Sequence, residues 1–317
     1  MLRAEKDLSE RDGIVIWEPG QGLAYQISGA LQRLGSRLIA LNSGDSNSFK
    51  NLPMQTWKWD EEKSQAATEF NSPFTSAVII PNESIAVSLR VRAEILKKNP
   101  KTQFVWVLPQ DHKKDVLQEW NSFFNLLNEN RLQATDFVFW TPPTFGFRDP
   151  LFFDQLIAEK TKRPGLFGLK EPEIPLEIIF SGDLASFVAG FFFAPKNTVP
   201  LKQINHFWLA PLKVTWPEFL NQFKSAFGFE NPGFLEKFAS RIEASSLANV
   251  LGLKNPPTPL LSLETLQNVL GTEHFMINAL DYFPSQLTST SRALNHLARV
   301  YRKDPNLELV FPPGSTP

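Results

Sequence analysis

A tyrosine and a lysine that lie one helical turn apart can exchange protons with a substrate near neutral pH, because the ammonium group lowers the pKa of the phenol. The chain has three tyrosines, Tyr25, Tyr282 and Tyr301, and the residues four positions later are glycine, glutamine and proline. The sequence therefore lacks this proton-transferring pair.

Other catalytic and metal-binding patterns are also missing. The chain has no cysteine, which excludes disulfides, thiolate catalysis and zinc–thiolate sites. Its histidines, His112, His206, His274 and His296, are not spaced as metal ligands. Asp183 could act as an acid, but its position in the sequence favours the N-cap of a helix. We predict no catalytic residue and no metal ligand from the residue types.

The composition argues for a globular protein that binds neither nucleic acid nor a membrane. Hydrophobic residues make up 42% of the 317-residue chain, and the formal net charge is −1. A chain so close to neutrality has no general attraction for polyanions. Residues 1–12 lack the apolar core of a secretory signal, and no apolar run reaches the ~20 residues that span a bilayer. We therefore expect a cytoplasmic protein without a membrane span.

The first half of the chain alternates between short apolar runs and amphipathic segments. Gly13–Trp17 predicts a strand, a turn follows at 18–22, and apolar residues at helical spacing predict a helix that ends at Gly35. Arg37–Leu41 predicts the next strand, so this segment is a strand–helix–strand unit of a parallel sheet. The same alternation predicts strands at 55–59, 77–80, 102–108 and 136–140 and helices at 84–98 and 114–128.

These elements predict an α/β fold with a Rossmann-like, doubly wound parallel sheet. We assign residues 1–12 to an N-terminal tail, 13–150 to the Rossmann-like domain and 151–317 to a smaller C-terminal α/β lobe. In the lobe the pattern predicts strands at 178–180 and 204–209 and helices at 184–193, 215–228, 233–250 and 289–302. Thr215, with Pro217 and Glu218 after it, has the form of a helix start.

Four phrases, in order along the chain, resemble segments of the extended short-chain dehydrogenase/reductase family, the NAD-dependent sugar epimerases and dehydratases. They are Trp140–Pro150 (Trp-Thr-Pro-Pro-Thr-Phe-Gly-Phe-Arg-Asp-Pro), Phe180–Ala185, His206–Gly228 and Ser289–Leu294. The resemblance implies that the C-terminal lobe is of the substrate-binding type. It also implies that the lobe is interleaved with the Rossmann-like domain, so the boundary at residue 150 is nominal.

The glycine-rich turn departs from the pattern of that family. The family has Gly-x-x-Gly-x-x-Gly, in which the glycines let the backbone approach a pyrophosphate. This chain has Gly20 and Gly22, but Pro19 and Tyr25 stand where the first and third glycines belong when Gly22 is aligned with the second. Proline lacks a backbone N–H, and Glu18 adds a negative charge nearby. Gly20 and Gly22 either bind a dinucleotide or form a tight turn without a ligand, and we favour the turn.

Two further residues match the places that the family uses for the adenosine half of its cofactor. Asn42, at the end of the second strand, or Asp45 could hydrogen-bond a ribose, and Asp60 corresponds to an aspartate that contacts adenine. Asp60 is equally explained as part of a solvated turn. No arginine or lysine follows Asn42 closely enough to favour a 2′-phosphate. We expect no cofactor, and if a dinucleotide binds, the resemblance implies NAD.

The catalytic segments of the family are lost. Its fifth strand ends in serine or threonine, whereas this chain has Leu108 and Pro109. Its tyrosine–lysine pair would fall near residues 118–124, which read Gln-Glu-Trp-Asn-Ser-Phe-Phe. We therefore predict a catalytically inactive relative that acts as a ligand-binding, protein-interaction or assembly module. The alternative is an atypical NAD(P)-dependent oxidoreductase or nucleotide-sugar epimerase/dehydratase with non-standard catalytic residues.

The resemblance also bears on partners. Members of the family often dimerise through two helices, which correspond here to 84–98 and 114–128. The second carries Trp120, Phe123 and Phe124, more apolar surface than one sheet face needs, although all three could equally be core residues. We predict a homodimer through these helices, or a different protein partner.

Overall fold

The computed structural model describes residues 13–19, 22–43, 52–60, 62–63, 65–67, 69–81, 85–109, 136–142, 144–147, 173, 175–193, 204–209, 212–228, 276–278 and 287–303. The chain forms two compact units, each assembled from separate stretches of sequence. The first comprises Met1–Thr141, Gly182–Ala210 and Leu261–Ser285, and the second comprises Pro142–Ser181, Pro211–Leu260 and Gln286–Pro317.

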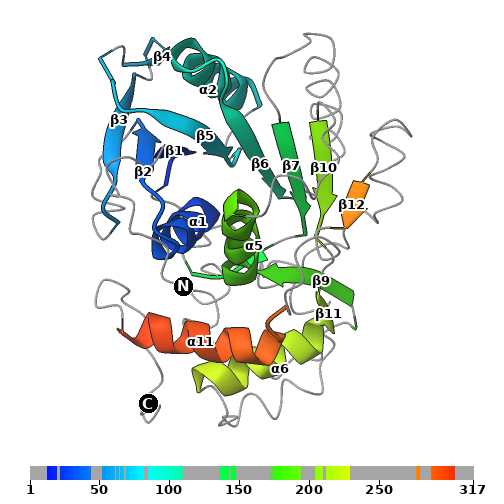
Figure 1. Cartoon of the computed structure of the whole chain (residues 1–317). Helices are drawn as coiled ribbons and strands as arrows, with labels where there is room; N and C mark the ends of the chain where they lie inside the picture. The colour runs from blue at the N-terminus through cyan, green and yellow to red at the C-terminus, as the bar shows by residue number, and fades with distance from the viewer. Residues whose placement is uncertain are drawn as a thin grey trace, which may run out of the picture. The chain divides into compact units, whose positions relative to one another are not determined.

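The first unit is built on a nine-stranded sheet with the strand order β12-β10-β7-β6-β5-β1-β2-β3-β4 (Figure 1). In chain order the strands are β1 (Gly13–Trp17), β2 (Leu38–Asn42), β3 (Gln55–Asp60), β4 (Gln65–Ala66), β5 (Phe74–Ile79), β6 (Gln103–Pro109), β7 (Asp136–Thr141), β10 (Ile204–Trp208) and β12 (Met276–Asn278). Neighbouring strands are parallel except β3 and β4. The chain runs outward from β1 to β3 and then crosses to the other side of β1 at β5. The sheet is therefore doubly wound, as the sequence predicted, and its direction of winding changes between β1 and β5.

Helices pack on both faces of this sheet, which is why its strands read as continuous apolar runs. Strand β7 divides its side chains between the two faces. Val138 and Trp140 join the core cluster that includes α2 (Ile85–Lys98), whereas Phe137 and Phe139 contact Phe191 of α5 (Ser181–Phe193). The α2 face also holds most of the tryptophans of the chain: Trp17, Trp57, Trp59, Trp106, Trp140 and Trp208. Helix α1 (Gly22–Arg33) follows β1, and Gly35, at φ 78°, lies just beyond its end.

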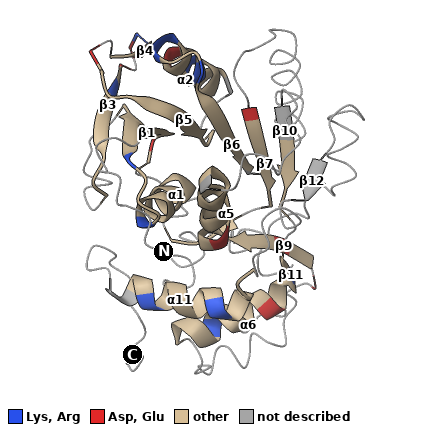
Figure 2. Ribbon diagram, viewed as in Figure 1, with Lys and Arg blue, Asp and Glu red and all other residues tan. Residues whose placement is uncertain are grey.

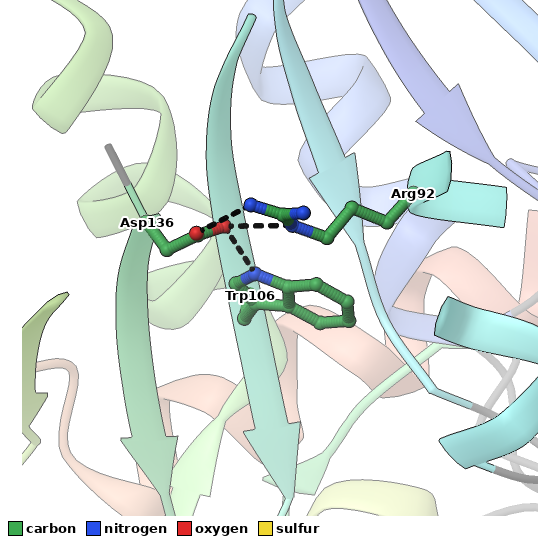
Figure 3. Close-up of polar contacts among 3 residues, drawn as sticks. All are labelled: Arg92, Trp106 and Asp136. Carbon is green, nitrogen blue, oxygen red and sulfur yellow. Dashed lines mark hydrogen bonds and ion pairs between the residues drawn. The ribbon is translucent and has the colours of Figure 1, made fainter. Parts of the chain in front are cut away.

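A buried ionic cluster ties α2 to the amino end of β7 (Figure 3). The guanidinium of Arg92 donates to both carboxylate oxygens of Asp136, from Nε at 3.3 Å and from Nη2 at 2.8 Å. The indole N–H of Trp106 donates to the same carboxylate at 3.0 Å. The Arg92 side chain is 5% exposed and that of Asp136 is 2% exposed, and the guanidinium also lies 4.7 Å above the ring of Phe104. The cluster thus links a helix and two strands through one carboxylate.

The second unit combines a three-stranded sheet, in the order β11-β9-β8, with two helices. Its elements are β8 (Thr144–Phe145), β9 (Pro175–Phe180), β11 (Leu212–Thr215), α6 (Trp216–Phe227) and α11 (Thr290–Lys303). Phe219 and Phe223 of α6 share a core with Leu294 and Leu297 of α11. This core depends on the helical spacing of its apolar residues, which also made both helices predictable from sequence.

Both ends of α6 have the signals that the sequence predicted. Thr215 Oγ1 accepts a hydrogen bond from the Glu218 N–H at 3.4 Å, and the Glu218 carboxylate accepts one from the Thr215 N–H at 2.8 Å. This capping box satisfies donors that the first turn of a helix leaves unpaired. The bond from the Thr215 N–H holds the pKa of Glu218 below its ordinary value. The helix ends at Gly228, whose φ of 81° is a left-handed conformation that suits glycine.

Other sequence predictions were less accurate. The prediction that Asp183 is an N-cap is wrong, because α5 begins at Ser181 and Asp183 lies inside its first turn. Strands β4, β8, β11 and β12 were missed, since segments of two to four residues carry too little periodicity to be recognised. The predicted helices at 114–128 and 233–250 lie outside the described residues. None of the described helices is long and apolar enough to cross a bilayer.

Candidate functional site

The candidate functional site is the carboxyl edge of the sheet at β1 and β5. In doubly wound sheets, ligands bind beyond the carboxyl ends of the strands, at the point where the direction of winding changes. Here that edge is formed by the turn after β1, which leads into α1, and by the ends of the neighbouring strands β2 and β3. The residues that define it are Glu18, Ser43 and Asp60, together with the glycine that opens α1.

Glu18 joins the ends of β1 and β2 through its side chain. Its Oε1 atom accepts a hydrogen bond from the backbone N–H of Ser43 at 2.9 Å and another from the Ser43 hydroxyl at 2.8 Å. Both residues are half-buried. Bonds to an ionised acceptor are stronger than bonds between neutral groups, so this arrangement fixes the residue that follows β2 to the turn that follows β1. We call these two residues the Glu18–Ser43 clasp.

The backbone of Glu18 is held in an unusual conformation. Its φ is 47°, in the left-handed region, and it is the one non-glycine residue with positive φ among those that the structure describes. Its N–H donates to the carbonyl of Leu41 at 3.0 Å, one residue before β2 ends. Left-handed backbone is unfavourable for a residue with a side chain and persists where surrounding contacts impose it. Here a backbone bond and the clasp together impose it.

The glycines predicted for a dinucleotide divide between described and undescribed residues. Gly22 is the first residue of α1 and has a φ of 42°, so the turn uses the conformational freedom of glycine at this position. Pro19, which has no N–H to offer a phosphate, is buried in the same turn. Tyr25 lies in the first turn of α1 and is half-buried. Gly20 lies outside the described residues.

Asn42 and Asp60, which were predicted to contact the adenosine half, lie at the ends of adjacent strands, and the alternative ribose contact, Asp45, lies outside the described residues. Asn42 is the last residue of β2, is 5% exposed and pairs in register with Lys58 of β3. Asp60, the last residue of β3, accepts the Lys63 N–H at 3.1 Å and forms an ion pair with the Lys63 ammonium at 3.3 Å. The backbone bond from Lys63 lowers the pKa of Asp60. Asp60 therefore closes its own turn, as the turn interpretation of the sequence expects.

Two buried tryptophans precede the last residues of this edge and pack against each other. Trp17 and Trp59 directly precede Glu18 and Asp60, and their rings meet edge to face with centroids 5.2 Å apart. Both rings are 7% exposed and belong to the core cluster on the α2 face. Rigid strand ends place the carboxylates of Glu18 and Asp60 at defined points on the edge.

Strand β6 ends in apolar residues, at the place where the sequence resemblance implied a serine or threonine. Leu108 is fully buried, and the β6 register pairs it with Trp140 and pairs Pro109 with Thr141 of β7. The nearest hydroxyl, from Thr141, is itself buried and donates to the carbonyl of Leu108 at 3.3 Å. The hydroxyl at this strand end is thus engaged in holding β6 and β7 together. The segment 118–124, where a tyrosine–lysine pair would fall, lies outside the described residues.

The described residues of this edge supply hydrogen-bond acceptors and internal bonds rather than an acid, a base and a nucleophile in mutual contact. No group of three or more His, Asp or Glu side chains that could hold a metal occurs within the described ranges. Sequence reasoning noted the negative charge of Glu18 but missed Ser43 as its partner. The two are 25 positions apart, and no local pattern indicates that they meet.

Comparison with known proteins shows which fold the chain has. The sequence matches no family model and no curated protein. Among solved structures, similar ones include the dTDP-glucose 4,6-dehydratase from Bacillus anthracis, solved with NAD (11% identity, TM-score 0.57, covering 94% of this chain and 98% of that one). Another is the UDP-glucose 4-epimerase from Thermotoga maritima, solved with UDP-glucose (13% identity, TM-score 0.54, covering 92% and 99%). A third is the Bordetella bronchiseptica enzyme WbmH, solved with NAD+ (13% identity, TM-score 0.56, covering 92% and 99%).

These similarities extend over nearly the whole of both chains in each pair. At such low identity they show that the fold is shared, while function has to be argued from the site. The chain has the Rossmann-like α/β fold of NAD-dependent epimerase- and dehydratase-type enzymes.

Proposed function

We propose that this chain is a non-catalytic protein with the fold of the extended short-chain dehydrogenases/reductases, and that it acts by binding a protein partner. The observation that carries the proposal is the Glu18–Ser43 clasp. It occupies the turn after β1 with a carboxylate of the chain itself, at the edge where this fold binds its ligands.

The residues of this turn fit a dinucleotide poorly. A pyrophosphate needs backbone N–H groups and the positive end of a helix, and a negative carboxylate close by opposes it. Pro19 has no N–H to offer in the turn, and Ser43 donates both its N–H and its hydroxyl proton to Glu18. The N–H and the hydroxyl proton of Ser43 are therefore not free to bind a ribose at the end of β2. These features support a turn closed by intramolecular bonds.

The sequence supports the same conclusion for catalysis. No tyrosine is followed four residues later by lysine anywhere in the chain, and β6 ends in leucine and proline. Loss of the proton-transferring pair and a closed cofactor turn are two independent changes. Together they favour loss of the ancestral chemistry over its rewiring.

The decisive experiment is a titration of the purified protein with NAD+, NADH, NADP+ and NADPH by calorimetry and thermal shift. We expect no heat and no shift with any of the four. Micromolar binding of any one would overturn the proposal, because the clasp would then have to open for a ligand.

A variant tests whether Glu18 is the cause. Glu18→Gly removes the carboxylate, frees both donors of Ser43 and suits the left-handed backbone at position 18. We expect NAD+ affinity to rise for this variant. The matched control is Glu62→Gly, which removes the same charge from an exposed residue and should leave the titration flat. A gain in both variants would attribute the effect to net charge instead of the clasp.

A second candidate is an atypical NAD(P)-dependent oxidoreductase or nucleotide-sugar epimerase/dehydratase that uses non-standard residues. The observation in its favour is Gly22, which keeps a left-handed backbone at the start of α1. It requires nicotinamide or sugar-nucleotide turnover, which a spectrophotometric assay at 340 nm and a product assay with UDP-glucose would detect. Absence of turnover together with absence of dinucleotide binding would exclude it.

The homodimer remains a proposal for the helices at 84–98 and 114–128. On α2, the exposed side chains include Ala86, Ala93 and Lys97, whereas the half-buried Val87, Leu89 and Leu96 pack against the core. Sedimentation equilibrium tests it. A dimer that is lost on Ala93→Glu would support these helices as the interface, and a monomer at all concentrations would remove it.

A further inference from the structure

One face of helix α11 carries exposed basic side chains, and its two exposed arginines form no ion pair with any residue that the structure describes. The helix runs from Thr290 to Lys303 and contains no aspartate or glutamate, so every ionised side chain along it is a cation (Figure 2). The side chains on its opposite face pack into the core of the second unit. Ala293, Leu294, Leu297, Ala298 and Tyr301 are all buried in the core that α11 shares with α6.

The exposed basic side chains on this face are aligned, and the ring of the central one, His296, meets that of Phe180 edge to face with centroids 6.2 Å apart. Arg292, His296 and Arg299 are exposed and follow one another at i, i+4 and i+7, the spacing that places side chains along one line of a helix. The next position at this spacing in the sequence is Lys303. We call Arg292, His296 and Arg299 the α11 stripe. Neither arginine makes a hydrogen bond or an ion pair within 4.0 Å in the described part of the chain.

The position of Arg292 is unfavourable for the helix itself. It lies in the first turn of α11, where the positive end of the helix dipole repels a cation, and the first turn contains no acidic residue that would compensate. Arg299 lies nearer the carboxyl end, where the dipole favours a cation. Because sequences usually follow local rules except where function requires otherwise, Arg292 indicates that this surface serves something other than helix stability.

We propose that the α11 stripe binds an acidic helix of a protein partner. Arg292 and Arg299 are two turns apart, about 10.5 Å along the axis, which matches carboxylates at i and i+7 on a facing helix. Guanidinium groups bind carboxylates through two parallel hydrogen bonds, which gives orientation as well as attraction. This inference rests on the proposed role in protein binding and names the chemistry of the partner.

The observations favour a protein over other polyanions. The net charge of the whole chain is −1, so it has no general field that would collect nucleic acid. Membrane binding needs apolar side chains beside the cations. The exposed large hydrophobic side chain among the described residues is Leu34, which directly follows α1 in the other unit. The α11 stripe is therefore a polar surface, about two helical turns long, whose charged side chains are all positive.

The test uses the full chain and a fluorescein-labelled alanine-based peptide of about 18 residues, long enough to be partly helical, with glutamates at i, i+4, i+7 and i+11. The control peptide has the same glutamates distributed around the helix. Fluorescence anisotropy should show binding of the first peptide, weaker binding of the second, and a loss of about tenfold or more in affinity between ~0.05 M and ~0.5 M NaCl.

Two variants with equal charge change locate the site. Arg292→Ala/Arg299→Ala should weaken binding of the first peptide by about tenfold or more. Arg33→Ala/Lys101→Ala removes two exposed cations of the first unit and should change it by less than about twofold. Circular dichroism and thermal melting confirm that both variants fold.

The proposal is overturned if the peptide does not bind, if the two double variants weaken binding equally, or if a DNA duplex or phosphatidylserine vesicles compete for the stripe more strongly than the acidic peptide. Dinucleotide binding by the protein, with peptide binding intact, would refute the non-catalytic role and leave the stripe standing. Absence of peptide binding, with no dinucleotide binding, would refute the α11 stripe and leave the non-catalytic role standing.

Discussion

Replacing Asp136 by alanine should destabilise the first unit more than any change at an exposed ion pair. Asp136 is the shared acceptor of Arg92 and Trp106, and its removal leaves a buried guanidinium without a counter-ion and an indole N–H without an acceptor. The Arg92 side chain is 5% exposed, so water cannot take the place of the carboxylate without rearrangement. Phe104 offers Arg92 a ring face at 4.7 Å, a weaker interaction than the lost ion pair.

The magnitude follows from what is left buried. Removing one partner of a buried ion pair typically costs about 3–5 kcal/mol, which corresponds to a factor of roughly 150 to 5,000 in the unfolding equilibrium constant. Replacing both partners by apolar residues of similar volume leaves no stranded charge. Arg92→Met/Asp136→Leu should therefore recover most of the loss, although Trp106 still lacks its acceptor and retains a cost of about 1–3 kcal/mol.

Urea denaturation followed by tryptophan fluorescence measures this effect, because six of the eight tryptophans lie in the same core cluster. Lys213→Ala provides a reference: it breaks an exposed pair with Glu177, with 81% of the Lys213 side chain accessible, and should cost about 0–1 kcal/mol. If Asp136→Ala costs no more than Lys213→Ala, or if the double variant is as unstable as the single one, the reasoning from a stranded charge is refuted.

Four further changes test the second unit. Gly146→Ala would place a Cβ 1.7 Å from Ser181 Oγ and 2.8 Å from Ser181 Cβ. We therefore expect thermal melting to show a loss of stability of about 1–3 kcal/mol, which a second substitution, Ser181→Gly, should partly restore. An unchanged melting temperature would contradict the close approach. Thr215→Ala removes the cap of α6 and should cost about 0.5–1 kcal/mol in urea denaturation, with no change in the midpoint arguing against the capping box. The pKa of Glu218 is lowered in the folded state, so its contribution to folding stability is present above the ordinary pKa of a glutamate and is lost as pH falls through the lowered value. The difference in stability between the wild type and Glu218→Ala should therefore disappear in acid. A difference that grows in acid would contradict this sign. Arg292→Glu should stabilise α11 by about 0.3–1 kcal/mol through the helix dipole while weakening the acidic peptide, and a loss of stability would contradict the argument from the dipole.

Much of the fold could be predicted because its signals are local. Strands β1, β2, β3 and β5, the helix of 22–33 and the capped helix of 216–227 all follow from the spacing of apolar residues and from Gly, Pro and Thr at element ends. Strands of two to four residues escaped, because so short a segment gains its structure from its neighbours in the sheet. The helix start predicted from Asp183 as a cap lies three residues too late, because α5 begins at Ser181, directly after β9 ends at Phe180.

The candidate site was harder to predict than the fold, because its bonds are long-range. Pro19, Gly22 and Asp60 were recognised as members of turns from their residue types, and Asp60 indeed bonds to a residue three positions away. The clasp joins positions that are 25 residues apart, and the buried ionic cluster joins positions that are 44 apart. Such contacts depend on strand order, which is known only once the sheet has been assembled.

The energetics of position 18 explain why a glutamate can stand where glycine would fit the backbone better. A left-handed residue with a side chain costs about 1–2 kcal/mol, which glycine would avoid. Glycine would also leave the N–H and hydroxyl of Ser43 without their acceptor, and each bond to a half-buried carboxylate is worth about 1 kcal/mol or somewhat more. The two bonds therefore offset the backbone strain. A turn built to receive a pyrophosphate would need those donors free. At this edge the balance of strain and hydrogen bonding favours internal closure, so the turn is stable without a ligand, which is what the proposed role at another surface requires.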